Sequence, residues 1–175
     1  TKQIHSIIAT NSLSSHIIAN ALVTLSITGA ASGDYISILP QSNNGCTNAH
    51  LHYYVVDWNS KELPWSDFRG KVLGPTDPAD APSGSLRAGI YADWKRLGLS
   101  DVPNTGDNGV HASASPFEGL AERMNWLKAT PESDEFGQKM LKAGISKDTI
   151  DKWSVDPQVK GKSVFDQLED LDADD

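Results

Sequence analysis

The sequence predicts an α+β fold, and three observations support this prediction. Residues 3–10 are rich in β-branched side chains, which is typical of a first strand. From Ser15 to Leu25, apolar residues recur at helical spacing after a serine that can cap a helix. Residues 35–39 and 51–58 again have the composition of strands. The order strand, helix, strand, strand is typical of the opening of an α+β sandwich.

The middle of the chain predicts an ordered loop with short helices, then a short strand and a helix. Between Leu63 and Gly89 there are four prolines and four glycines, too many for one long regular element. A strand is expected around His111. The sequence Ser115-Pro116 with Glu118 predicts a helix start, because the Ser and Glu side chains can satisfy free backbone N–H groups. The expected apolar face of this helix consists of Phe117, Leu120, Ala121, Met124 and Leu127.

Serine-capped helical patterns continue to the end of the chain, over 133–144, 146–153 and 163–171. We therefore expect a main domain over 1–129, a helical C-terminal extension over 130–165 and an acidic tail over 166–175. The extension is expected to pack on the main domain or on another subunit. For the main domain the element order predicts a ferredoxin-like fold, a βαββαβ antiparallel sheet with helices on one face.

Composition and charge exclude several classes of protein. The net charge is −8, but the last ten residues hold six acidic groups and no basic ones, so the rest of the chain carries about −2. A solvated tail is the simpler interpretation of this run, and a partner-binding segment is the alternative. Lys and Arg form no dense cluster, so we expect no nucleic-acid partner. No apolar stretch is long enough to span a bilayer, so we expect no membrane association.

The expected compartment is the cytoplasm or an organellar matrix. The single cysteine, Cys46, excludes an internal disulfide framework and fits a reducing compartment. The chain begins with Thr1 rather than Met, which is compatible with earlier removal of a targeting segment.

The most informative group of residues surrounds His111. This histidine lies just before a helix N-terminus, and one loop-rich stretch nearby supplies Arg69, Lys71 and Arg87 together with Thr, Asn and Ser side chains. Cationic side chains and helix N-termini stabilise phosphoryl oxygens, and a neutral imidazole nitrogen can attack phosphorus. The residue types therefore favour phosphate chemistry, whereas the alternative for a single histidine among serines is a hydrogen-bonded structural role.

Several separated stretches decide between these alternatives, because they resemble the nucleoside diphosphate kinase family. Residues 72–80, Val-Leu-Gly-Pro-Thr-Asp-Pro-Ala-Asp, are similar to the family's Leu-Gly-x-Thr-Asn-Pro-Ala-Asp loop, and 85–87, Ser-Leu-Arg, to its Thr-Ile-Arg. Residues 108–115, Asn-Gly-Val-His-Ala-Ser-Ala-Ser, resemble its Asn-x-x-His-Gly-Ser-Asp-Ser strand. Glu122 and Trp126 match the following helix at unchanged spacing. The resemblance covers 51–127 well and 3–40 in outline, and it ends after Ala129.

The resemblance implies a phosphotransferase that moves the γ-phosphate of a nucleoside triphosphate to a nucleoside diphosphate through phospho-His111. Glu122 would hold the other imidazole nitrogen, with Ser113 beside it. The implied phosphate- and nucleotide-binding residues are Arg87, Thr76, Lys71 and Asn108. Mg²⁺ would be held mainly by the nucleotide, with no metal site made of protein side chains. The implied partners are nucleoside di- and triphosphates and further copies of the chain in a dimer-based homo-oligomer.

Two departures from the family pattern leave a second hypothesis open. The family's first strand ends in Lys-Pro-Asp-Gly, and residues 9–12 here read Ala-Thr-Asn-Ser, without the lysine. Ala114 stands where the family has Asp. The alternative is therefore a nucleotide-binding or interaction module that keeps the fold with weak or no catalysis. About eleven additional residues between Arg87 and Asn108 include Trp94, Lys95 and Arg96. Tyr91 or Trp94 could stack a base and Lys95 or Arg96 could replace the missing lysine, but a core or subunit-contact role is the simpler interpretation of the aromatic residues.

Two other groups of residues are expected to be structural. His50 and His52 would point the same way on a strand, but no third metal ligand is near them in the sequence. Asp77 and Asp80 lie in a Pro-rich loop, where Asp side chains commonly bond nearby backbone N–H groups.

Overall fold

The computed structural model describes residues 18–26, 51–99 and 101–175, which form two compact units. The helical unit comprises 18–22, Val55–Ser66 and Ser113–Asp175. The loop unit comprises 23–26, 51–54 and Asp67–Ala112. The predicted strands at 3–10 and 35–39 lie outside the described residues. Each unit is considered by itself below.

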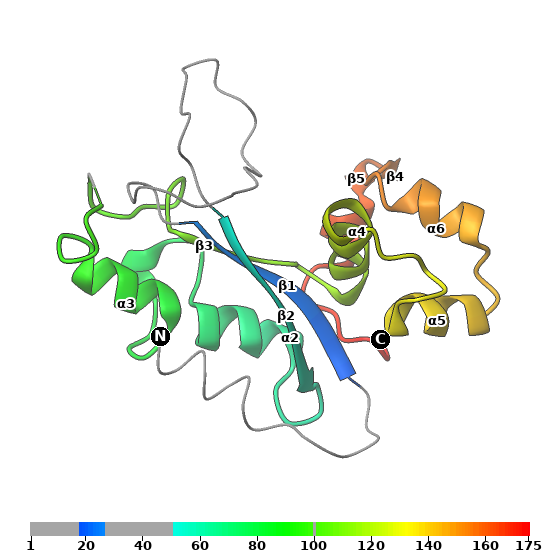
Figure 1. Ribbon diagram of the computed structural model, residues 1–175, viewed down its shortest axis with the longest axis horizontal. Helices are drawn as coiled ribbons and strands as arrows, with labels where there is room; N and C mark the ends of the chain where they lie inside the picture. The colour runs from blue at the N-terminus through cyan, green and yellow to red at the C-terminus, as the bar shows by residue number, and fades with distance from the viewer. Residues whose placement is uncertain (1–17, 27–50, 100) are drawn as a thin grey trace. The chain divides into compact units, whose positions relative to one another are not determined.

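The described strands β1 (Ile18–Ser26), β2 (Leu51–Asn59) and β3 (Val110–Ala112) form a three-stranded sheet in the order β2–β1–β3 (Figure 1). The prediction of strands over 51–58 and around His111 is confirmed. β3 runs antiparallel to β1, with three residue pairs in register: Val23 with Ala112, Thr24 with His111, and Leu25 with Val110. The ferredoxin-like arrangement stays a prediction, because it depends on strands outside the described residues.

One element is predicted wrongly, since residues 18–26 form strand β1 and not a helix. The spacing of Ile18, Leu22 and Leu25 suits a helical face, but Val23 and Thr24 are β-branched and fit a pleated sheet. β1 lies between β2 and β3, so its backbone finds hydrogen-bonding partners on both sides. Such tertiary pairing overrides a local apolar period, which is only a weak determinant of secondary structure.

The region between β2 and β3 forms the short helices that its prolines and glycines predict. They are α2 (Trp65–Asp67), the π-helical segment η1 (Phe68–Leu73), the 3-10 helix η2 (Pro78–Asp80) and α3 (Leu86–Asp93). Asp77 caps η2, with its Oδ1 accepting the Ala79 N–H at 3.0 Å. The expectation that Asp77 bonds a nearby backbone N–H is confirmed.

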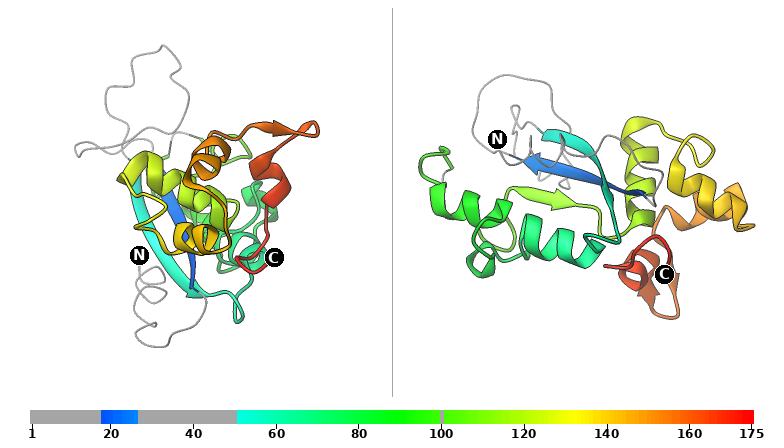
Figure 2. Two further views of the ribbon diagram at one scale, coloured as in Figure 1. Left: turned by 90° about the vertical axis from the view of Figure 1, so that its right-hand side faces the viewer. Right: turned by 90° about the horizontal axis from the view of Figure 1, so that it is seen from below.

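The core of the helical unit forms where α4 (Pro116–Leu127) meets the C-terminal helices α5 (Glu135–Lys142), α6 (Lys147–Trp153) and α7 (Val164–Leu168). In Figure 2 these helices follow one another from yellow-green to red, with a hairpin of β4 (Gln158–Val159) and β5 (Lys162–Ser163) before α7. The core consists of Phe117, Leu120, Met140, Ile150 and Val164. The four helices therefore share one apolar cluster, to which α4 contributes Phe117 and Leu120 of its predicted face, with Met124 packed against it.

The helix caps largely follow the sequence prediction. Ser115 Oγ accepts the Glu118 N–H at 3.2 Å at the start of α4, as expected, and Ser146 and Ser163 cap α6 and α7. The cap of α5 differs from the prediction, because Asp134 and not Ser133 accepts its first free N–H groups. A carboxylate is a strong N-cap because it also interacts favourably with the positive end of the helix dipole.

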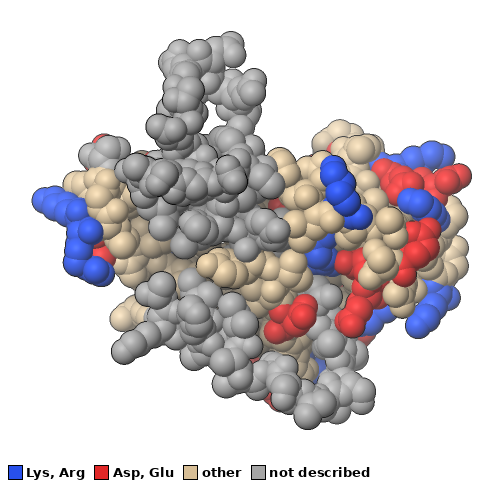
Figure 3. Space-filling view, in the orientation of Figure 1, with Lys and Arg blue, Asp and Glu red and all other residues tan. Residues whose placement is uncertain are grey.

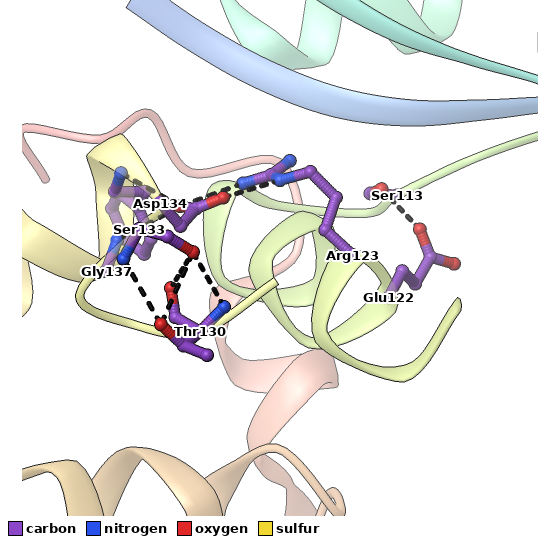
Figure 4. A network of polar contacts seen from close by, with 8 residues as sticks. Ser113, Glu122, Arg123, Thr130, Ser133, Asp134 and Gly137 are labelled. Carbon is purple, nitrogen blue, oxygen red and sulfur yellow. Dashed lines mark hydrogen bonds and ion pairs between the residues drawn. The ribbon is translucent and has the colours of Figure 1, made fainter. Parts of the chain in front are cut away.

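Asp134 also forms a buried ion pair with Arg123, which joins α4 to α5 (Figure 4). Nε and NH2 of Arg123 lie 2.7 and 3.2 Å from the two carboxylate oxygens, and both side chains are 5% exposed. Removing one partner of such a pair leaves a buried charge without compensation, at a cost of about 3–5 kcal/mol. The pair therefore fixes how α4 packs on the C-terminal helices.

The close approach of α5 to the preceding loop predicts that Gly137→Ala destabilises the protein. A Cβ at position 137 would lie 2.5 Å from the carbonyl oxygen and 2.6 Å from Cα of Pro131, and backbone atoms cannot yield as a flexible side chain does. We expect a loss of about 1–3 kcal/mol in the free energy of unfolding by urea. Gly89→Ala on α3 is the control, because a Cβ there meets nothing within 4 Å and the change favours a helix. Equal effects of the two substitutions would contradict this packing.

The carboxyl group of Asp57, on β2, is affected by the charges around Arg123. We therefore expect its substitution to change the stability of the protein in a pH-dependent way. Burial raises the pKa of Asp57 above its ordinary value of 3.8; Glu135 and Asp134 add to the increase, and Arg123 opposes it. Because the pKa of Asp57 is higher in the folded than in the unfolded state, protonated Asp57 favours the folded state. This contribution to stability is fully present below pH 3.8 and is lost as the pH rises through the folded-state pKa. Asp57→Asn is therefore expected to raise the unfolding midpoint at neutral pH and to lose this gain in acid. Glu62→Gln, which removes an exposed carboxylate, is the control; an equal gain there would contradict the prediction.

Candidate functional site

His111 lies at the middle of β3, between two buried residues. Val110 is 5% exposed and Ala112 is 6% exposed, whereas His111 is intermediate. Successive side chains of a strand point to opposite faces. The burial of its neighbours therefore places the His111 side chain on the face of β3 opposite to Val110 and Ala112.

Arg87 connects the backbone of this strand to the loop after η1. Ser85 caps α3 and so places Arg87 in the first turn of the helix. The guanidinium donates from NH1 to the Gly74 carbonyl at 2.5 Å and from NH2 to the Val110 carbonyl at 2.7 Å. One planar side chain thus holds together the two stretches that the resemblance assigns to nucleotide binding.

Gly74 allows this loop to pack against the beginning of α3. Its φ is +93°, in the region that side-chain-bearing residues rarely adopt, and a Cβ would meet Ser85 Oγ at 2.8 Å and Ala81 Cβ at 2.9 Å. The glycine of the Leu-Gly-x-Thr motif is therefore required by a close contact and by its backbone conformation.

Thr76 and Asn108 are brought together at the other end of the same loop. Asn108 Nδ2 donates to the Thr76 carbonyl at 3.0 Å, and Asn108 Oδ1 accepts the Val110 N–H at 3.3 Å. Asn108 thus connects the loop to the residue before His111. Two predicted site residues are therefore in direct hydrogen-bonding contact, although here the contact uses the Thr76 backbone and not its hydroxyl.

The two basic residues of η1, Arg69 and Lys71, have different surroundings. Lys71 Nζ lies 2.7 Å from Asp67 Oδ2, and the side chain of Lys71 is 70% exposed. Arg69, in contrast, is close enough to Arg87 that its charge lowers the Arg87 pKa, second to the effect of burial. Sequence reasoning counted Arg69 among the cationic side chains of this loop but assigned the phosphate contact to Lys71.

Arg87 combines this like-charged neighbour with an unused donor. Its buried Nε has no hydrogen-bond partner, and among the described residues no carboxylate forms an ion pair with it. A buried guanidinium N–H group without a partner can be satisfied by an anion. Arg87 is therefore the candidate anion-binding residue of the loop unit.

In the helical unit, Ser113 and Glu122 are joined directly. Ser113 is completely buried, and its Oγ donates to Glu122 Oε2 at 2.5 Å, as Figure 4 shows. The Ser113 carbonyl accepts the indole N–H of Trp65 at 3.0 Å. The next residue, Ala114, donates its N–H to the Glu118 carboxylate. The pair that the resemblance places beside the histidine is thus formed, and Trp65 is a neighbour that sequence reasoning missed.

The predicted site residues are consequently divided between the two units. Lys71, Thr76, Arg87, Asn108 and His111 belong to the loop unit, and Ser113 and Glu122 belong to the helical unit. Among the described side chains, no group of three or more His, Cys, Asp and Glu is arranged to hold a metal ion. The side chains of His50 and His52 lie outside the described part.

Charges of both signs are interspersed over the described residues of the helical unit on the face drawn in Figure 3. Some of them form surface pairs, such as Lys147 with Asp151 at 3.0 Å. Within the described ranges, no helix has the length and apolar character needed to cross a membrane.

Comparisons of the chain with models of protein families, with curated proteins and with solved structures find no match.

The bridging role of Arg87 predicts that Arg87→Lys destabilises the protein even though it preserves the charge. A single ammonium group on a flexible chain lacks the planar fork that reaches both the Gly74 and the Val110 carbonyls. We expect a loss of about 1–3 kcal/mol in urea unfolding and faster amide exchange in β3. Arg96→Lys, at an exposed pair with Asp93, should leave both measurements unchanged. An unchanged stability of Arg87→Lys would show that the two hydrogen bonds contribute little.

Proposed function

We propose that the protein is a phosphotransferase that moves the γ-phosphoryl group of a nucleoside triphosphate to a nucleoside diphosphate through phospho-His111. The observation that carries the proposal is the cationic surroundings of β3. Arg87 is hydrogen-bonded to the residue before His111, has a buried donor without a partner, and is repelled by Arg69. Phosphoryl transfer requires mainly such positioning and charge stabilisation.

In the proposed cycle, an imidazole nitrogen of His111 attacks the γ-phosphorus, and the bond from this phosphorus to the bridging oxygen breaks. The electron pair stays on the leaving nucleoside diphosphate. A terminal oxygen of a second nucleoside diphosphate then attacks the phosphohistidine, and the P–N bond breaks to regenerate the neutral imidazole. Arg87 and Arg69 stabilise the charge of the phosphoryl oxygens, while Thr76 and Asn108 position the nucleotide.

The proposed role of Glu122 is to hold the second imidazole nitrogen and so to select the tautomer that attacks. Its carboxylate is itself oriented by the Ser113 hydroxyl at 2.5 Å. An oriented carboxylate also stabilises the positive charge that develops on the imidazole during phosphorylation.

Mg²⁺ belongs to this proposal as a companion of the nucleotide. The carboxylate of Asp77, in the loop of the proposed site, accepts a backbone N–H at the start of η2 and is occupied with capping. In the proposal, the phosphates of the nucleotide provide most of the ligands to Mg²⁺. A bound Mg²⁺ would neutralise part of the phosphate charge.

The alternative proposal is a nucleotide-binding module with little turnover. Two observations favour it: residues 9–12 lack the family's lysine, and Lys71, which could replace this charge, is paired with Asp67. Loss of one preorganised cation at such a site costs about 3 kcal/mol of transition-state stabilisation. The binding module would keep the anion site of Arg69 and Arg87 without forming phosphohistidine.

Incubation with γ-labelled ATP and Mg²⁺ tests the first proposal. We expect an acid-labile, base-stable label on the wild-type chain, no label on His111→Ala, and an unchanged label on the control His52→Ala. Nucleoside diphosphates should then remove the label. Labelling of His111→Ala at the wild-type level would exclude this histidine as the acceptor.

The same samples distinguish the alternative. If the wild-type chain takes up no label but binds ATP by calorimetry, and Arg87→Ala weakens this binding, the nucleotide-binding module is the correct description. Light scattering of the same protein tests the proposed dimer-based assembly.

A further inference from the structure

The acidic segment 166–175 contacts the residues that precede α4. The Asp170 N–H donates to the Ala114 carbonyl at 2.9 Å, and Asp172 Oδ1 accepts the Trp65 N–H at 3.0 Å. All four residues belong to the helical unit. The sequence favoured a solvated tail, but at these two positions the segment is bound to the protein.

Trp65 connects this segment to the Ser113–Glu122 pair. Its side chain is completely buried, and its ring lies 4.8 Å from that of Trp58. Its backbone N–H is held by Asp172, and its indole N–H donates to the Ser113 carbonyl at 3.0 Å. Displacement of the Trp65 backbone would therefore change the position of the Ser113 carbonyl.

The hydrogen bonds form a continuous series from the acidic segment to Glu122. Asp172 accepts from Trp65, Trp65 donates to Ser113, and the Ser113 hydroxyl donates to Glu122. The bond between Trp65 and Ser113 is buried, and the bonds that involve Asp172 and Glu122 are part-buried. An unpaired group in the buried part of such a network is costly.

We propose that Trp65 and Asp172 are positioning residues, which hold Ser113 and thereby orient the Glu122 carboxylate. The catalytic consequence rests on the proposed function, in which Glu122 orients His111. Asp172, at one end of this network, lies about sixty residues after Ser113 in the chain. The acidic segment is therefore the part of the chain that holds Trp65 and, through it, Ser113.

The Asp172 carboxylate accepts the Trp65 N–H at 3.0 Å in a partly buried environment. Partial burial raises its pKa, as do Asp175 and Asp174, while the Trp65 N–H opposes the increase. A carboxylate in a solvated tail would not lose hydration in this way. The neighbouring Asp174 is exposed and carries the same charge, so it provides a matched control.

Hydrogen exchange in the full chain tests the positioning network without any assumption about catalysis. Asp172→Ala removes the acceptor and should accelerate exchange of the Trp65 backbone and indole N–H groups about tenfold. Asp172→Asn keeps an acceptor oxygen, and Asp174→Ala keeps Asp172, so both should exchange as the wild type does. Equal exchange in Asp172→Ala and Asp174→Ala would overturn the proposal.

Phosphorylation by γ-labelled ATP then tests the catalytic consequence. Asp172→Ala should label about tenfold more slowly at saturating ATP, with little change in the ATP concentration for half-maximal rate, and Asp172→Asn should restore the rate. An unchanged rate in Asp172→Ala would overturn the positioning role in catalysis. If the wild type takes up no label, the proposed function fails. The exchange experiment still decides whether the acidic segment orders Ser113.

Discussion

Ser113 and Ser115 are buried, and the hydrogen bonding of the segment 113–115 is the constraint on which the proposed site depends. Ser113 is 0% exposed and Ser115 is 1% exposed, so their polar groups are shielded from water. Buried backbone N–H and C=O groups are almost always hydrogen-bonded, because leaving one unpaired is costly. Here the partners come from Trp65, from α4 and from Asp170. The N-terminus of α4 is thus held by residues before and after it in the chain. Glu122 lies in the same helix.

Two arginines show how burial and partners separate a structural charge from a candidate binding group. Arg123 is 4% exposed and pairs with both oxygens of Asp134, so its charge is compensated inside the protein. Arg87 is half-buried and donates to neutral carbonyls, and its burial and, second, the charge of Arg69 lower its pKa. A carboxylate compensates the first charge, whereas no carboxylate among the described residues pairs with the second. This difference is the physical basis for assigning an anion to Arg87.

Local signals allowed much of the helical unit to be predicted. The serines before α4, α6 and α7 cap these helices as expected, because a cap depends on residues three or four positions apart. Contacts between distant segments were less accessible. The strand β1 was predicted as a helix, since its partner strands lie far away in the sequence. The phosphate contact was assigned to Lys71, and only the fold shows that Lys71 pairs with Asp67 and that the charge of Arg69 acts on Arg87.

The sequence by itself determined the starts of α4, α6 and α7 and the Pro- and Gly-rich loop, and its resemblance to a family selected His111, Ser113 and Glu122 as a group of interest. The helix starts follow from spacing along the chain, over the distances within one capped helix. The tertiary structure alone decided that Ser113 bonds to Glu122, that Arg87 spans two carbonyls, and that Asp172 holds Trp65. Each of these contacts joins residues at least nine positions apart. They form only when burial removes water as the competing partner and leaves each polar group to bond within the protein.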